Sequence, residues 1–453
     1  MRRAEATALL AVAALGTTSA VARLRAMASL SPPDLAFFHQ ATWSAARGDG
    51  FTQTALEFDA GTLFGSIHLS LIRAVWVPLY AALPAVETLI ALQGIALTAG
   101  TAAAVAASRP RSHDRTPWIL LAGLSPGALA LGACDLRPLT FLVPAVILTA
   151  AGLVRRRPLL TGLGVLGALL AREEAWMVLA ALLPLAILQR TWRGPALLIA
   201  GIASSLALPR VIWGHGGNIA ANTDLPGTLD ALLSGQRPWI RWPVELYFAG
   251  RVLLAAWPAV LCPELLVPAL AGWAYISIFS QLEPAAPQHG GLHYLSVVVP
   301  LVLAAAAIGL GRLVDRYPTR QRTLLAAALG GLVFSIPEAT TAARWVVRTL
   351  QPTPLQATVQ QLRASPGGVL TISSAAPLLS GRQTLRIQGH FAPTPERITT
   401  VATEVDHALL YAERPPDGPP ADEWDRWQNA LPEAGLEVQA IEEGVAVWGR
   451  SPD

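Results

Sequence analysis

Charged side chains that stand beside long apolar segments are the residues of this chain that could do chemistry. Asp34 follows the first apolar segment by a few residues, and Arg172, Glu173 and Glu174 interrupt a later one. A carboxylate in a partly desolvated cleft can act as a general base, and an arginine offers a fixed fork of donors to a phosphate. Three charges at the apex of an apolar hairpin cannot face lipid cheaply, so we expect them to line a cavity open to the outside.

The segment that follows Asp34 is expected to be an amphipathic helix just outside a membrane. Pro33 and Asp34 make a good helix start, because a carboxylate can cap free backbone N–H groups. Residues 37–46 supply a broad apolar face, and Gly48 and Gly50 end the helix. An interfacial helix in which Asp34 is only a cap accounts for the same pattern.

The composition indicates a protein with many membrane-spanning segments. The chain has 453 residues, of which 53% are hydrophobic and only 14% charged, whereas a soluble domain is about a quarter charged. The basic pI of about 9.2 is better explained by arginines in cytoplasmic loops than by nucleic-acid binding. Cys134 and Cys262 are expected on opposite faces of the membrane, so no disulfide is predicted.

Arginine-rich ends orient the apolar segments, because cytoplasmic loops carry an excess of positive charge. Arg2 and Arg3 place the N-terminus in the cytoplasm, and the arginines at 155–157 mark another cytoplasmic turn. The expected spans are residues 6–24, 86–107, 118–134, 139–154, two short arms within 158–193, 194–213, 246–261, 265–279, 294–313 and 324–336. This count of about eleven places the C-terminus outside.

Two N-terminal segments have further interpretations. The first apolar segment also fits a cleavable signal peptide, although an uncleaved helix would keep Asp34 anchored at the membrane. Residues 67–83 are apolar but broken by Arg73 and Pro78, so we expect them to insert only partly, on the outer side. The outer loop that carries Asp34 therefore extends over residues 31–69.

From about residue 351 the apolar runs shorten and charge and proline increase. The expected strands are residues 369–373, 384–388, 407–412 and 438–447, and the expected helices are residues 355–362, 396–404 and 421–431. The fold class is thus an all-α polytopic membrane bundle at residues 1–350 with a small exported α/β domain at residues 351–453.

Several motifs resemble known families. Asp34, the aromatic pair Phe37–Phe38 and the run Gly48–Asp49–Gly50–Phe51 resemble the first outer loop of the GT-C superfamily of membrane glycosyltransferases. The runs CDLRPLTFLVPAVIL, LLAREEAWMVLAAL and HYLSVVVPLVLAAAAIGL, at residues 134–148, 169–182 and 293–310, resemble the bacterial membrane-protein family called domain of unknown function 2079. That family is itself similar to the GT-C enzymes.

The resemblance implies a transfer of sugar from a polyprenyl-phosphate donor at the periplasmic face of a bacterial inner membrane. It makes Asp34 the base, and Arg137 and Arg172 suit the donor phosphate. The expected substrate-binding residues are Asp135, Arg137, Arg172, Glu173, Glu174, His68, His293 and Tyr294. The structural alternatives are an interfacial pair at Asp135–Arg137, an ion pair at Arg172–Glu173, a satisfied interfacial His68, and headgroup anchoring by His293 and Tyr294.

The chain departs from the family pattern at two places. Ile67 precedes His68 where the family often has an acid, and residues 135–139 read DLRPL where the family tends to have DFHPE. A metal site built from these positions would be crippled, so we expect no metal, or a degenerate site, and no other cofactor. The competing hypothesis is a non-catalytic transporter or cell-envelope assembly protein that kept the fold. The expected partners are a lipid-linked sugar and membrane lipid, without nucleic acid; the acceptor is unknown.

Overall fold

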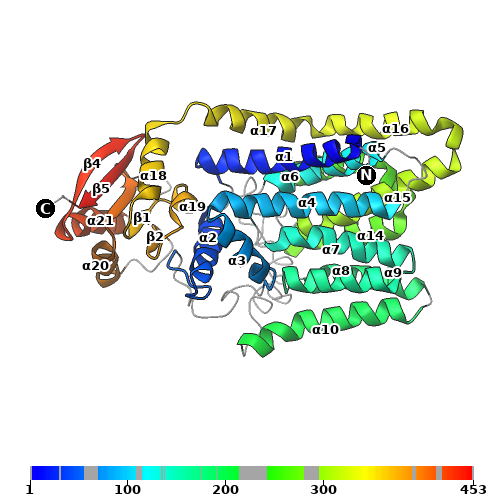
Figure 1. The fold of residues 1–453 in the computed structure, drawn as a ribbon, viewed down its shortest axis with the longest axis horizontal. Coiled ribbons are helices and arrows are strands. Elements are labelled where there is room, and N and C mark those ends of the chain that lie inside the picture. Colours follow the sequence, from blue (N-terminus) through cyan, green and yellow to red (C-terminus); the bar gives the residue numbers. More distant parts are fainter. Residues whose placement is uncertain are drawn as a thin grey trace. The chain divides into compact units, whose positions relative to one another are not determined.

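The computed structural model describes residues 3–29, 32–55, 70–108, 115–133, 136, 138–173, 175–189, 191–213, 242–279, 295–389, 394–414 and 421–450, with the backbone alone at 242–246, 274–279 and 295–297. Its contacts divide the chain into two compact units. The first consists of residues 1–20, 67–72 and 91–344, and the second of residues 21–66, 73–90 and 345–453. The domain boundary near residue 350 stays a prediction. Figure 1 labels the elements of both units.

Within the described residues, five helices are long and apolar enough to cross a membrane. They are α1 (Arg3–Arg25), α4 (Val86–Ser108), the part Arg193–Ile212 of α10 (Arg193–Trp213), the part Val298–Arg316 of α15 (Leu295–Arg316), and the run Pro318–Thr349. That run comprises η4 (Pro318–Arg320), α16 (Gln321–Gly330), η5 (Gly331–Ser335) and α17 (Ile336–Thr349), and it continues well beyond the end expected at residue 336. The chain is therefore mostly helical and multi-pass, but the count of eleven spans is not confirmed.

The span expected at residues 118–134 is broken in two. Helices α5 (Thr116–Gly123) and α6 (Pro126–Ala133) meet at an angle of 58°. Pro126 has no N–H to donate and disfavours helical geometry at the residue before it, which explains the bend. Counted as one span, the pair raises the number of spans to six.

The remaining apolar helices of the first unit are shorter. They are η1 (Pro138–Phe141), α7 (Leu142–Val154), α8 (Pro158–Ala171), α9 (Ala175–Leu188), α13 (Trp242–Ala255), η2 (Trp257–Leu261) and α14 (Pro263–Phe279). As expected, α8 and α9 form a hairpin of two 14-residue arms. At 1.5 Å per residue each arm is about 21 Å long, which is short of a hydrocarbon core of about 30 Å.

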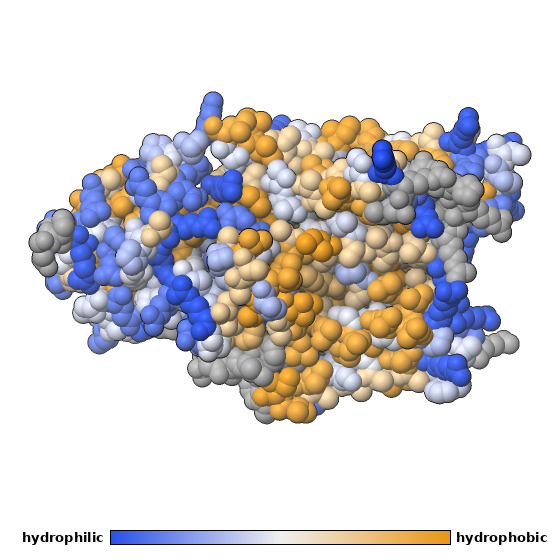
Figure 2. Space-filling view, viewed as in Figure 1, coloured by the Kyte–Doolittle hydropathy of each residue, from blue (hydrophilic) through white to orange (hydrophobic). Residues whose placement is uncertain are grey.

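Close helix contact in this unit depends on glycine at a few positions. A Cβ at Gly164 of α8 would lie 2.5 Å from the backbone nitrogen of Thr149 in α7. The apolar cluster that these helices enclose includes Leu142, Val146, Ala168 and Leu179, all fully buried. Figure 2 shows hydrophobic side chains across the face of α8 and α9, as expected for a surface that meets lipid.

The second unit contains the helix α2 (Pro32–Ala46), which was expected in an outer loop, and the short helix α3 (Arg73–Ala82), and the two helices pack against each other. Gly48 and Gly50 end α2 with positive φ angles of 93° and 74°, as expected. The expected single apolar face is wrong, because residues 35–42 are all buried. Their polar members find protein partners instead of water, as described below. With ten residues, α3 is too short to cross a membrane.

The C-terminal part of this unit is an α/β domain with a five-stranded sheet in the order β2-β1-β3-β5-β4. Strands β1 (Val369–Thr371), β2 (Leu385–Ile387) and β3 (His407–Tyr411) pair in parallel, and β5 (Val445–Arg450) runs antiparallel to β3 and β4 (Leu436–Glu442). The helices are α18 (Pro354–Ala364), α19 (Ala376–Leu379), α20 (Pro395–Glu404) and α21 (Ala421–Glu433).

One expected strand is wrong. Residues 438–447 form a hairpin rather than one strand, because Glu443 and Gly444 adopt positive φ angles of 52° and 76° between β4 and β5. Two successive residues with positive φ are what a two-residue hairpin turn requires. The other three strands and the three helices lie where the sequence predicted them.

Candidate functional site

Asp34 lies in the first turn of α2, which begins at Pro32, two residues before the aspartate. The carboxylate is half-buried and sits inside the helix rather than at the N-cap position. There it complements the positive end of the helix dipole. Phe37 and Phe38 follow it by three and four residues and therefore share its face of the helix.

An arginine that the sequence did not single out lies against this same face. Arg73, the first residue of α3, is 1% exposed. Its guanidinium carbon lies 5.6 Å, 5.4 Å and 4.9 Å from the ring centres of Phe37, Phe38 and Phe51. The aromatic residues of the outer-loop motif thus hold a cation by cation–π contact. Burial lowers the pKa of Arg73, but the side chain stays cationic at neutral pH.

His39 of α2 is buried, and its side chain connects α2 to α3 and to the residue that follows α19. Its Nδ1 lies 2.7 Å from Ser380 Oγ, and its Nε2 lies 2.8 Å from the Tyr80 hydroxyl. The Ser380 hydroxyl donates to the carbonyl oxygen of Pro377, so it must accept from Nδ1–H, which leaves Nε2 to accept from Tyr80. A neutral imidazole therefore satisfies all three of these hydrogen bonds. Burial lowers the pKa of His39 to about 3, which agrees with the neutral form.

Further contacts tie the C-terminal domain to α2. The Gln40 amide donates to the carbonyl oxygen of Arg382 at 3.0 Å, and its oxygen accepts the N–H of Thr54 at 2.8 Å. Gly381 also faces α2, where a Cβ would meet His39 Cε1 at 3.4 Å, an ordinary van der Waals distance. The helix with the candidate base is therefore seated on the C-terminal domain.

A bidentate ion pair joins the C-terminal domain to the start of α4. Arg363 donates to both carboxylate oxygens of Glu87, at 3.1 Å and 2.8 Å. The hydrogen bonds to Glu87 raise the pKa of Arg363 above its ordinary value. Both side chains are less than a third exposed, so the pair is better shielded from water than most surface ion pairs.

In the first unit, the structure buries two of the charges expected at the apex of the α8–α9 hairpin. Arg172 and Glu173 are 3% and 2% exposed. The Ser205 hydroxyl of α10 donates to the Glu173 carbonyl oxygen and accepts the N–H of Trp176, which fastens the turn to the next helix. Neither side chain faces lipid, in agreement with the cost of charge in hydrocarbon.

Comparison with known proteins gives the family. Residues 29–369 match the family described as predicted membrane protein, domain of unknown function 2079. The chain belongs to this family. No curated protein matches it. Among solved structures, it is similar to the crystal structure of ArnT from Cupriavidus metallidurans in the apo state, at 12% identity and a TM-score of 0.59, over 98% of both chains.

The similarity to ArnT shows that this DUF2079 protein shares the ArnT fold. At so low an identity the likeness concerns the fold alone. It extends through the C-terminal α/β domain, beyond residue 369 where the family match ends.

Several predicted site residues of this DUF2079 protein lie outside the described residues, namely His68, Asp135, Arg137, Glu174, His293 and Tyr294. Their roles stay predictions, as does the convergence of Asp34 and Arg172, which belong to different units. In the described parts of the chain, no three His, Cys, Asp or Glu side chains are grouped as a metal site would need. His39, Tyr80 and Arg73 are the additions that sequence reasoning missed, and their only local signal was a polar type within an apolar segment.

Proposed function

We propose that this protein is a GT-C-type glycosyltransferase that moves a sugar from a polyprenyl-phosphate donor to an acceptor at the outer face of a bacterial inner membrane. The observation that carries the proposal is that a carboxylate and a cation lie at the same face of α2. Asp34 of α2 is half-buried, and the buried Arg73 of α3 lies against Phe37 and Phe38 on that face. The family and the ArnT-like fold support it.

In this mechanism Asp34 takes the proton of the acceptor hydroxyl as that oxygen attacks the anomeric carbon of the sugar. The bond between this carbon and the phosphate oxygen breaks, and the lipid phosphate leaves with the bonding electrons. Arg73 stabilises the charge that develops on the phosphate, because a cation in a desolvated site attracts an anion more strongly than one in water. Arg137 and Arg172 are further proposed phosphate-binding residues, and Asp135, Glu173 and Glu174 are proposed to contact the sugar.

The test is sugar transfer by the purified protein in proteoliposomes, with a panel of polyprenyl-phosphate sugars. Asp34→Asn should lower kcat by at least about 100-fold, since a general base contributes on the order of 10²–10⁴. Asp422→Asn removes an exposed carboxylate of α21 and should leave transfer unchanged. Equal transfer by the wild type and Asp34→Asn would remove Asp34 as the base. Absence of transfer with every donor would favour the non-catalytic transporter or assembly protein.

A further inference from the structure

The end of the α8–α9 hairpin opposite Arg172 carries a cavity that the proposed transfer does not use. Its volume is about 400 Å³, and it lies between the α7–α8 turn and the α9–α10 turn. Eleven residues line it, among them Arg156, Arg157, Thr161, Gln189, Trp192 and Arg193. Because α8 has 14 residues, about 20 Å separate this cavity from the Arg172 turn.

The charge at this cavity has one sign. Arg156, Arg157 and Arg193 line it, and none of the eleven lining residues carries a carboxylate. No ion pair of these arginines is found among the described residues. In the sequence, Glu173 and Glu174 are the only acidic residues between 138 and 213, and Glu173 lies at the other end of the hairpin. The cavity is therefore suited to an anion.

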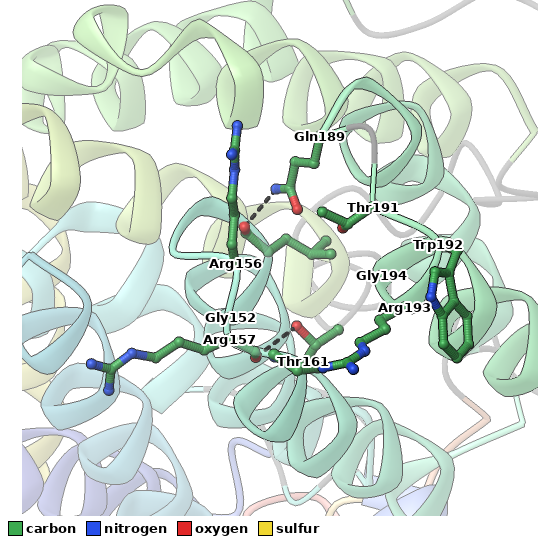
Figure 3. Close-up of a pocket in the computed structure, with 11 residues that line it drawn as sticks. Gly152, Arg156, Arg157, Thr161, Gln189, Thr191, Trp192, Arg193 and Gly194 are labelled. Carbon is green, nitrogen blue, oxygen red and sulfur yellow. Dashed lines mark hydrogen bonds between the residues drawn. The ribbon is translucent and has the colours of Figure 1, made fainter.

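The side chains leave this anion room. Figure 3 shows Arg193 extending toward Thr161, whereas Arg156 and Arg157 leave the turn in two other directions. All three arginines are exposed, so they can turn toward a ligand without breaking a buried contact. The Thr161 hydroxyl donates to the Arg157 carbonyl oxygen and the Gln189 amide donates to the Leu153 carbonyl oxygen, so the second amide N–H of Gln189 is the neutral donor left for a ligand.

Arg156 has a backbone conformation that is unfavourable for arginine. The N–H groups of Arg156 and Arg157 donate to the carbonyl oxygens of Leu153 and Gly152, at 2.8 Å each. This is the Schellman ending of a helix, whose left-handed residue is usually glycine. Here Arg156 takes that place with a φ of 55°, a conformation that is unfavourable for any residue except glycine.

The surface beside the cavity is apolar and matches acyl chains. Leu159, Leu163 and Leu166 form a stripe along α8, each more than half exposed, and the stripe begins one residue after the lining residue Pro158. Trp192 is 77% exposed at the mouth, where tryptophan is typical of the headgroup level. Figure 2 shows the hydrophobic face of α8 and α9 bounded by hydrophilic side chains at this end.

We propose that this cavity binds the headgroup of an anionic phospholipid, whose phosphodiester faces the three arginines and whose acyl chains lie along the leucine stripe of α8. Basic pockets between membrane helices are a known form of lipid recognition. A free phosphate would use the arginines but not the stripe, so the two ligands can be separated by experiment.

The test is titration of the purified, delipidated full-length protein with phosphatidylglycerol, counted by native mass spectrometry. Arg156→Gln/Arg157→Gln/Arg193→Gln should weaken binding on the order of 100-fold, at about 1 kcal/mol per arginine. The matched control Arg316→Gln/Arg320→Gln/Arg322→Gln removes three exposed charges elsewhere and should bind as the wild type does. Arg156→Gly keeps the turn, so it should weaken binding about fivefold while raising the melting temperature.

Three outcomes would overturn the proposal. One is binding of phosphatidylcholine as tight as that of phosphatidylglycerol, which would show that the arginines do not distinguish an anionic headgroup from a zwitterionic one. Another is displacement of the lipid by millimolar inorganic phosphate, which would make this a phosphate site. The third is unchanged phosphatidylglycerol binding by the triple variant and by Arg156→Gly, since the latter retains the native turn.

Discussion

Two buried polar residues near the candidate base handle the cost of burial in different ways. His39 gives up its charge and forms hydrogen bonds with both ring nitrogens, to Ser380 and Tyr80. Arg73 keeps its charge and is held by three phenylalanine rings. A buried neutral group needs its hydrogen bonds, whereas a buried cation needs negative charge or aromatic faces. Only the second arrangement keeps a positive charge close to Asp34 on the face of α2 that Phe37 and Phe38 form.

The His39 arrangement predicts a pH dependence of stability. Above pH 6.5 both the folded and the unfolded states hold this imidazole neutral, so it contributes no slope. Below pH 6.5 the unfolded state binds a proton that folded His39 accepts only near its pKa of about 3. The free energy of unfolding should therefore fall as the pH decreases through this window, by at most about 1.4 kcal/mol per pH unit.

Equilibrium unfolding in mixed micelles between pH 7.5 and pH 4.5 measures this slope. His39→Gln can keep a hydrogen bond but does not titrate, so its stability should fall less steeply than that of the wild type. Parallel curves for the two proteins would show that the pKa of His39 is the same in the folded and unfolded states.

At the scale of elements, helix contact in the hairpin region depends on which glycines face a neighbour. Gly162 and Gly164 lie two residues apart on α8, and a Cβ meets very different surroundings at the two positions. At Gly164 it would lie 2.6 Å or less from three atoms of α7, whereas at Gly162 its nearest neighbour is Leu197 Cδ2 at 3.8 Å. One glycine is required by packing and the other is not.

This pair gives a matched prediction. Gly164→Ala should destabilise the protein by about 1–3 kcal/mol, because two packed backbones would have to separate. Gly162→Ala should stabilise it by up to about 1 kcal/mol, because alanine has the higher helix propensity and has room there. The free energies of unfolding of both variants, measured against the wild type, test this. Equal effects would mean that α7 and α8 do not pack as described.

At the scale of the whole molecule, the second unit is built from both ends of the chain, residues 21–66 and 73–90 together with residues 345–453. Ser380 contacts His39 across 341 residues of sequence, and Arg363 contacts Glu87 across 276. The C-terminal domain is therefore part of the support of the outer-loop helix.

The distribution of arginines along the sequence predicts the side of the membrane on which the C-terminal domain and the α7–α8 turn lie. In a variant without Cys134 and Cys262, a cysteine at Glu437 of β4 should react with a membrane-impermeant maleimide in intact cells. A cysteine at Arg157 should react only after permeabilisation, since arginine-rich turns stay in the cytoplasm. Labelling of both positions from the same side would contradict the proposed periplasmic site.

Signals that act over a few residues were sufficient to predict much of the fold. The start of α18 is an example, because Thr353 and Gln356 form a capping box within four residues. The α8–α9 hairpin follows from its apolar run and its charged turn. The hairpin at residues 443–444 was missed because its turn places Glu443, a residue uncommon there, at a positive φ.

By itself, the sequence determined the membrane class, the family, the C-terminal α/β elements and the candidacy of Asp34, since each depends on composition or on residues close together in the chain. Only the tertiary structure decided that His39 is a neutral link to Ser380, that Arg73 lies against Phe37, Phe38 and Phe51, and that three arginines from two turns line one cavity. These contacts join residues tens to hundreds of positions apart. Their free energy comes from burial and pairing in the folded chain, which no local pattern records.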